Sequence, residues 1–171
     1  MDNLFNDLHN DKKPLAERMR PKTLNEFCGQ KHIIGEGKLL RRLIEAKRVP
    51  SVIFYGPPGT GKTTLARIIA DSSESNFVKM NAISSGVAEV KEVIAKAKQE
   101  FEIYGKRTYL LLDECHRWNK AQSDSLLAAL ENGYLNFVGC TTENPSHSMT
   151  RAIVSRCSVF EFKRLGVEDI K

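Results

Sequence analysis

The fold is decided by the stretch Gly56-Pro57-Pro58-Gly59-Thr60-Gly61-Lys62-Thr63-Thr64. It matches the pattern G-x-x-x-x-G-K-[ST], which forms a loop around the phosphates of a nucleotide. The glycines let the backbone curl so that successive N–H groups face inward, and the next helix adds its positive end. We expect all nine residues to bind ATP, with Lys62 on the β- and γ-phosphates and the Thr63 hydroxyl on Mg²⁺.

The flanking residues predict the context that this loop needs. Residues 51–55 form a short apolar run that is typical of a buried strand, and residues 63–70 continue as a helix. Further strands are expected at 76–80, 108–112, 135–140 and 158–162, and further helices at 38–47, 87–103 and 120–130. In the 38–47 helix we expect an inward face made of Leu39, Leu40, Leu43 and Ile44. Strands that alternate with helices predict an α/β fold, the three-layer P-loop NTPase sandwich around a five-stranded parallel sheet.

Two carboxylates, Asp113 and Glu114, directly follow the strand expected at 108–112. We assign Asp113 to Mg²⁺, which a carboxylate can orient through its water shell, and Glu114 to polarising the attacking water. Because adjacent strand residues point to opposite faces, both can serve one site only if the chain turns at the strand end. The pair favours a nucleotide hydrolase over a small-molecule kinase. For His116, a structural role is expected ahead of one beside the reacting groups.

Polar side chains also follow the strand expected at 135–140. Thr142 is the first choice, and Asn144 the second, for a group that hydrogen-bonds the γ-phosphate or its attacking water. The alternative is a capped turn before the following proline. Arg156 precedes the last expected strand; supplied to a neighbouring subunit, it would neutralise charge in the transition state. Arg151 is a nearby competitor for that role.

The charge is unevenly distributed along the 171 residues, whose net charge is +5. Residues 12–48 hold 11 basic and 4 acidic side chains, a sum of +7 that leaves −2 for the rest. This basic segment suits contact with nucleic acid, and a solvated basic surface is the alternative.

Composition limits the class of protein. The chain is 41% hydrophobic and 27% charged, as in ordinary globular domains, and no apolar run is long enough to span a bilayer. Residues 1–13 are expected to be a flexible tail without a signal-peptide pattern, which points to the cytoplasm. The four cysteines are far apart and form no C-x-x-C pair, so we expect reduced thiols rather than a zinc site.

Several segments together resemble the family of the bacterial replication-associated recombination protein A (RarA, also called MgsA), which includes the Werner helicase-interacting protein of eukaryotes. These segments are residues 14–21, 27–30, 56–64, 113–122, 141–145 and 155–157. The resemblance extends from residue 14 to about residue 165. Many ATPases share the phosphate loop, whereas the H-R-x-N-K-A-Q run followed by T-T-E-N-P is more specific.

The resemblance implies the large subdomain of a AAA+ ATPase of the clamp-loader clade. Residues 14–165 would form the nucleotide-binding core and residues 166–171 the start of a lid, with the lid and the C-terminal domains missing from what would be a fragment. The roles implied for single residues are Lys62 and Thr63 at phosphate and Mg²⁺, Asp113 and Glu114 as Walker B, Thr142 or Asn144 as sensor 1, and Arg156 as arginine finger. Asn81 stands where clamp-loader relatives restrain the catalytic glutamate, although many members of the resembled family differ there.

The function implied by the resemblance is a DNA-dependent ATPase of replication-fork maintenance and of recombination or repair. Its cofactors would be ATP and Mg²⁺, and ATP binding and hydrolysis by the fragment alone are expected to be weak. Its partners would be DNA with single-stranded gaps, ends or forks, further copies of itself, and a single-stranded DNA-binding protein.

Three other functions fit parts of the sequence. A bacterial clamp-loader motor subunit carries a cysteine-rich zinc module between the phosphate loop and Walker B, and nothing in this sequence matches it. Branch-migration motors share the D-E-x-H-R run, but Ser155-Arg156-Cys157 argues against that function. A nucleotide-binding adaptor without hydrolysis would not need Lys62, Asp113 and Glu114 together.

Overall fold

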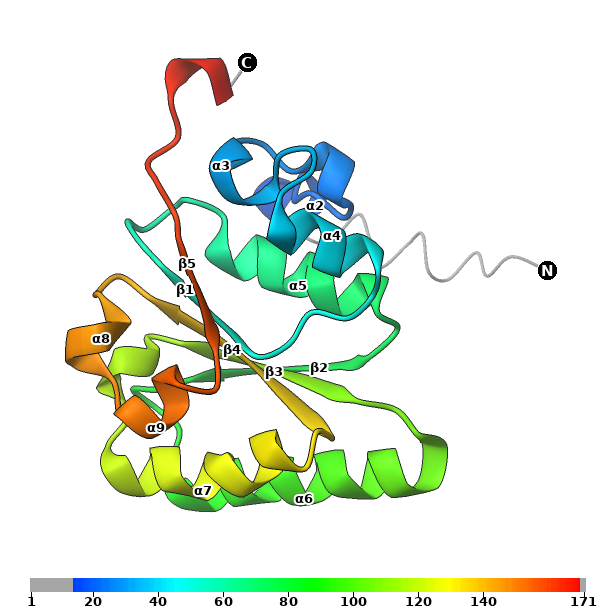
Figure 1. Cartoon of the computed structure of the whole chain (residues 1–171), viewed down its shortest axis with the longest axis vertical. Coiled ribbons are helices and arrows are strands. Elements are labelled where there is room, and N and C mark those ends of the chain that lie inside the picture. The colour runs from blue at the N-terminus through cyan, green and yellow to red at the C-terminus, as the bar shows by residue number, and fades with distance from the viewer. Residues whose placement is uncertain (1–13, 170–171) are drawn as a thin grey trace.

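The computed structural model of the chain describes residues 14–169, and Figure 1 shows how their helices and strands are arranged. The five strands are β1 (Val52–Tyr55), β2 (Asn76–Asn81), β3 (Thr108–Asp113), β4 (Leu135–Thr141) and β5 (Ser158–Glu161). They pair in parallel in the order β2-β3-β4-β1-β5. The expected five-stranded parallel sheet is therefore confirmed. The expected tail, residues 1–13, and the last two residues lie outside the described part.

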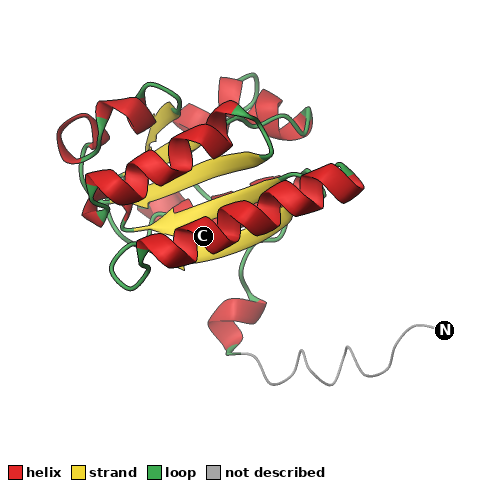
Figure 2. Cartoon of the chain, turned by 90° about the horizontal axis from the view of Figure 1, so that it is seen from below, coloured by secondary structure: helices red, strands yellow, loops and turns green. Residues whose placement is uncertain are grey.

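Helices cover both faces of the sheet (Figure 1). On one side lie α2 (Leu15–Arg18), α3 (Lys31–Ile34), α4 (Leu39–Glu45) and α5 (Lys62–Ser72). On the other lie α6 (Val87–Tyr104), α7 (Lys120–Glu131), α8 (Pro145–Ser148) and α9 (Arg151–Val154). Figure 2, seen from this second side, shows the two long helices α6 and α7 running side by side across the strands. Single-turn 3₁₀ helices complete the described chain at Leu24–Glu26, Cys115–Arg117 and Val167–Asp169.

The central strand β3 explains why the sheet is buried on both faces. Successive side chains of a strand point to opposite sides. Tyr109 and Leu111 accordingly join the core beneath α4 and α5, whereas Leu110 and Leu112 join the core beneath α6 and α7. A strand buried on both faces is a continuous apolar run rather than an alternating one, which is the pattern seen in the sequence.

The N-K-A-Q run begins α7 with a reciprocal cap. The side chain of Asn119 accepts a hydrogen bond from the Gln122 N–H, and the side chain of Gln122 accepts one from the Asn119 N–H, each at 2.9 Å. The Gln122 amide also donates to the carbonyl of Ser85 at 2.7 Å. The cap thereby ties the start of α7 to the loop between β2 and α6, because one buried side chain serves both.

The expectation of an inward-facing Leu39 is wrong. Leu39 is 62% exposed, whereas Leu40 and Ile44 are buried and Leu43 is half-buried. With only two turns, α4 buries a narrow stripe at i and i+4, and its first residue projects to one side of that stripe. The four-residue helices α2, α3, α8 and α9 had no counterpart among the expected elements, since one turn is too short to show a helical period.

Within residues 14–169, no helix combines the length and the apolar character that crossing a bilayer requires.

Candidate nucleotide site

A cleft of about 360 Å³ opens where β1, β3 and β4 end. It is lined by Pro58, Gly59, Thr60, Gly61, Lys62, Thr63, Thr64, Asp113, Glu114, Thr141 and Thr142. The carboxyl ends of parallel strands meet at one edge of a sheet, and ligands of open α/β sheets bind there. The structure therefore brings the phosphate loop, the acidic pair and Thr142 to one place, although they are separated in the sequence.

Two glycines of the loop lie where no side chain fits. Gly56 has a φ of +143°, and a Cβ there would lie 2.1 Å from the carbonyl oxygen of Phe162. Gly61 has a φ of +95°, and its Cβ would lie 2.7 Å from the ring of Phe27. Gly61 is also the N-cap of α5, where it offers no side chain to the first turn. The N–H groups that begin α5 are thus suited to an anion.

Lys62 reaches back across the loop. Its ammonium donates to the carbonyls of Gly56 and Pro57, both at 2.7 Å, so these two residues hold the lysine although they are not part of the cleft lining. Partial burial lowers the pKa of Lys62, while the nearby carboxylates of Asp113 and Glu114 act in the opposite direction. A cation held over a row of inward N–H groups is the arrangement that binds phosphate oxygens.

The turn that the acidic pair requires is a left-handed residue. Asp113 ends β3, and Glu114 follows with φ 55° and ψ 38°. This conformation costs a residue with a side chain about 1–2 kcal/mol, so it persists only where the surroundings impose it. Its effect is to bring both carboxylates to the cleft, where consecutive residues of a regular strand would diverge. The Asp113 carboxylate also lies 3.7 Å from the ammonium of Lys79.

The donors available to a metal ion fit Mg²⁺. Thr63 contributes a hydroxyl and Asp113 a carboxylate, and both line the cleft. Mg²⁺ prefers such oxygen ligands and keeps several waters, so two protein ligands beside phosphate oxygens suffice.

The two sensor candidates are placed differently. Thr142 lines the cleft. Asn144 is the N-cap of α8, and its side chain accepts a hydrogen bond from the Ser146 N–H at 3.0 Å. The side chain of Asn144 therefore makes the capped turn that the sequence offered as the alternative. Asn81 is also engaged locally, because its side chain accepts from the Ile83 N–H at 2.9 Å.

Arg156 is not brought to the cleft of its own chain. It lies just before β5, whose first residue, Ser158, pairs with Val52, the first residue of β1. The phosphate loop follows the last residue of β1, so Arg156 lies at the opposite edge of the sheet. Its guanidinium donates to the Glu131 carboxylate at 3.0 Å and to the Ala152 carbonyl at 2.8 Å.

Gln30, which lies in one of the segments that carry the resemblance, supports the site from outside the cleft. Gln30 is buried with a φ of +53°. Its amide donates to the carbonyls of Lys163 at 2.7 Å and Thr60 at 3.3 Å, and it accepts from the Lys163 N–H at 2.9 Å. It ties the N-terminal segment to the phosphate loop and to the chain after β5. A contact between residues 133 positions apart leaves no local signal in the sequence.

A glycine-rich loop at a helix N-terminus, beside an acidic strand end in this parallel sheet, defines a P-loop nucleotide-binding domain. The chain belongs to the family described as the Holliday junction DNA helicase RuvB P-loop domain, which matches residues 19–156.

Three proteins show the degree of similarity. The chain is 46% identical to the replication-associated recombination protein A of Escherichia coli K12, covering 100% of this chain and 38% of that protein. It is 44% identical to the ATPase WRNIP1 of Dictyostelium discoideum, covering 99% and 20%. The structure of the Thermotoga maritima RuvB Holliday junction branch migration motor aligns with a TM-score of 0.73 at 29% identity, covering 89% of this chain and 51% of that one.

These comparisons confirm the resemblance to the RarA family and the AAA+ fold that it implied. The chain spans less than half of the length of these two curated relatives.

Gly61→Ala is expected to damage the site more than Gly59→Ala. Both glycines have a positive φ, 95° and 72°, but only at Gly61 does a Cβ meet another group, the ring of Phe27. Either alanine costs about 1–2 kcal/mol for its backbone conformation. The collision adds to this at Gly61, so we expect a lower Tm and about tenfold weaker ATP binding than in Gly59→Ala. Thermal unfolding and titration with a fluorescent ATP analogue measure both, and equal losses in the two variants would contradict the expectation.

Proposed function

We propose that this chain is the ATP-binding and ATP-hydrolysing core of a DNA-dependent ATPase that acts in replication-fork maintenance and in recombination or repair. The observation that carries the proposal is that Glu114 and Asp113 line the same cleft as the phosphate loop. The names of the relatives, replication-associated recombination protein A among them, support the biological setting.

The residues of the cleft suggest how the reaction runs. The backbone N–H groups of the loop and of the start of α5 would hold the β- and γ-phosphates, and Lys62 would exchange its two carbonyl partners for phosphate oxygens. Thr63 and Asp113 would hold Mg²⁺, which neutralises phosphate charge when bound. Glu114 would accept a proton from the attacking water, and Thr142 would orient that water or the γ-phosphate.

Arg156 is proposed as the residue that a neighbouring copy supplies to this cleft. Its distance from its own cleft and its exposed guanidinium support this role, because an exposed side chain can reach another copy. To do so, the guanidinium would exchange the Glu131 carboxylate for a phosphate. An arginine placed in this way lowers the barrier only in an assembly, so the proposal includes a homo-oligomer.

DNA is proposed to lie against the helical layer that contains α2, α3 and α4. The exposed basic residues of this region are Arg18, Arg20, Lys22, Lys31, Lys38, Arg42, Lys47 and Arg48. Of the basic residues there, Arg41 pairs with Glu45 and Lys47 with Glu74. Ends, forks or single-stranded gaps are the proposed DNA structures, with a single-stranded DNA-binding protein as a further partner. A DNA partner also supports a cytoplasmic, nucleoid-associated location.

Glu114→Gln is expected to separate hydrolysis from binding. The amide cannot accept the proton of the attacking water, so turnover should fall by about 10²–10⁴-fold while ATP affinity is retained. Phosphate release and equilibrium titration measure the two quantities. Glu102→Gln, on the exposed face of α6, serves as the control and should leave both unchanged. Equal ATP binding by the wild type and Glu114→Gln, with hydrolysis by neither, would favour an adaptor that uses the nucleotide only as a structural ligand. Equal turnover in both would show that Glu114 is not the group that accepts the proton.

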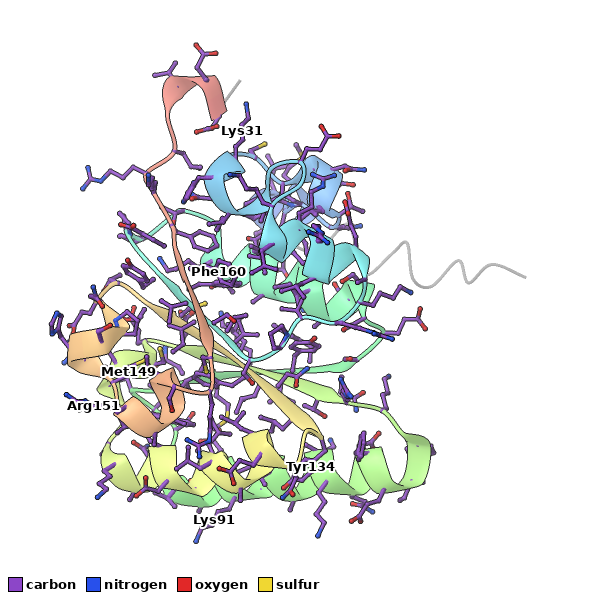
Figure 3. All side chains as sticks on the ribbon, in the orientation of Figure 1. Lys31, Lys91, Tyr134, Met149, Arg151 and Phe160 are labelled. Atoms are coloured by element: carbon purple, nitrogen blue, oxygen red, sulfur yellow. The ribbon has the colours of Figure 1, made fainter. Side chains whose placement is uncertain are left out.

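Arg156→Ala is expected to reduce hydrolysis by about 10³-fold or more without weakening ATP binding. Mixing tests the transfer between copies: Glu114→Gln chains retain Arg156, and Arg156→Ala chains retain Glu114. Neither variant should hydrolyse ATP well alone, and their mixture should regain part of the activity. Arg151→Ala, at the exposed start of α9 (Figure 3), is the control. A mixture no more active than its components would argue against a shared site.

DNA is expected to stimulate hydrolysis, and Lys31 is expected to contribute to its binding. Lys31 and Lys91 are both exposed but lie on opposite helical layers, as Figure 3 shows. Lys31→Ala should reduce the slope of log affinity against log salt by about 1, whereas Lys91→Ala should leave it unchanged. The measurements are ATPase rates with gapped, forked and blunt duplex DNA, and DNA binding over a range of salt concentrations. No stimulation by any of these DNAs would remove DNA dependence from the proposal.

A further inference from the structure

His116 lies between the acidic pair and the end of β4. It belongs to the single 3₁₀ turn that follows Glu114, and its side chain is only 6% exposed. Its Nδ1 atom lies 2.8 Å from the Thr141 hydroxyl, within hydrogen-bonding distance. Its Nε2 atom lies 3.6 Å from a carboxylate oxygen of Glu114 and 3.5 Å from one of Glu143. One buried imidazole therefore faces a hydroxyl on one side and two carboxylates on the other.

The groups around the ring indicate which of its two nitrogens carries the hydrogen. Ionised carboxylates only accept hydrogen bonds, so Nε2 must carry a hydrogen to interact favourably with either of them. In the neutral ring, Nδ1 is then an acceptor, to which the Thr141 hydroxyl donates a hydrogen bond. The Thr141 oxygen can still accept, and it does so from the Glu143 N–H at 3.0 Å. Hydrogen bonds thus link the Glu143 N–H, the Thr141 hydroxyl and Nδ1 of His116, and the other side of the ring faces Glu114 at 3.6 Å.

Among the described residues, His116 is the only one whose side-chain nitrogen lies within 4 Å of the carboxylate of Glu114, with Nε2 at 3.6 Å. Asn81, the other candidate for that role, uses its side-chain oxygen on the Ile83 N–H. The backbone of Glu114 is left-handed, and the 3₁₀ turn that contains His116 follows it directly. Within residues 14–169, no side chain forms a hydrogen bond with the carboxylate of Glu114, so this imidazole is its nearest polar neighbour.

Thr141 also connects these hydrogen bonds to the phosphate loop. The carbonyl of Thr141 accepts a hydrogen bond from the Gly56 N–H at 3.1 Å, and Thr142 is the next residue. Thr141 is therefore bonded through its backbone to the start of the loop and through its hydroxyl to His116. A displacement of Glu114 relative to the loop would have to stretch this connection.

We propose that His116 is a positioning residue for ATP hydrolysis, which holds the carboxylate of Glu114 in a fixed relation to Thr142 and the phosphate loop. This inference rests on the proposed function, because it takes Glu114 as the group that accepts the proton of the attacking water. It differs from the structural role expected from the sequence, for which the bond to Thr141 and burial alone would suffice. Glu143, which is more exposed than Glu114, competes for the same Nε2 proton at almost the same distance.

Two substitutions separate the two sides of the ring. An asparagine places its amide near the position of Nδ1, so His116→Asn retains the bond to Thr141 and loses the reach to Glu114. A glutamine extends to the position of Nε2, so His116→Gln retains the reach to Glu114. Misplacement of a catalytic group by about 1 Å can cost on the order of 10²-fold in rate. We therefore expect kcat to fall by about 10–10²-fold in His116→Asn and to be largely restored in His116→Gln.

The measurements are kcat, KM, equilibrium ATP affinity and Tm for both variants and for His147→Gln, an exposed histidine of α8 that serves as the control. A positioning role predicts that kcat falls in His116→Asn while KM, ATP affinity and Tm stay near the wild-type values. A purely structural role predicts that kcat, affinity and Tm fall together in both variants, and this result would overturn the inference. So would a His116→Asn variant with the kcat of the wild type.

A readout independent of turnover is the ¹⁵N NMR spectrum of the histidine rings. The neutral His116 ring should show a protonated Nε2, whose resonance shifts in Glu114→Gln and not in Glu102→Gln. A neutral ring protonated on Nδ1 instead, or an Nε2 resonance insensitive to Glu114→Gln, would overturn the inference. A wild-type chain that hydrolyses no ATP would remove the proposed function and the positioning role together. A wild type that hydrolyses ATP beside an equally active His116→Asn variant would remove the positioning role alone.

Discussion

The close packing of the Gly56 backbone between the ends of β4 and β5 is the interaction on which the rest of the structure depends. The Gly56 N–H donates to the carbonyl of Thr141, and the Phe162 N–H donates to the carbonyl of Tyr55 at 2.7 Å. A Cβ at Gly56 would collide with the Phe162 carbonyl, so only glycine lets the strands come this close. Where the phosphate loop begins, the chain is therefore hydrogen-bonded to β4 through Gly56 and to the residue after β5 through Tyr55. The acidic pair follows β3, which pairs with β4 on the side away from β1, so β4 connects the pair to the loop.

The sequence alone predicted the features that are determined locally. The five strands, the long helices and the phosphate loop arise from apolar runs, helical stripes and a glycine pattern, each contained within about twenty residues. The residues that line the cleft from β1 and β3 could be found in the same way, because a motif marks the end of each strand. Leu39 shows where such reasoning stops: a leucine counted into an apolar stripe is exposed, since a helix of seven residues buries only part of that stripe.

The features that could not be predicted rest on contacts between distant parts of the chain. Gln30 is buried because the carbonyls of Thr60 and Lys163 surround it, and nothing in its own neighbourhood in the sequence indicates this. His116 lies two residues after Glu114, but its hydrogen-bond partner Thr141 lies 25 residues further along the chain, at the end of β4. The site therefore has two levels of organisation. Motifs supply the groups that would touch a nucleotide, and long-range hydrogen bonds of buried polar side chains fix how those groups lie relative to one another.

The role proposed for Arg156, at the edge of the sheet opposite its own cleft, would limit how copies of this domain can associate. An arginine that serves a neighbour's cleft joins two different surfaces, one that gives and one that receives. Such a contact is heterologous, so it cannot be satisfied by a two-fold dimer in which the same patch meets itself. Each added copy presents a new free cleft at one end and a new free arginine at the other. With Arg156 in this role, the assembly would close into a ring or continue as a helical array, and only a closed ring would complete every cleft.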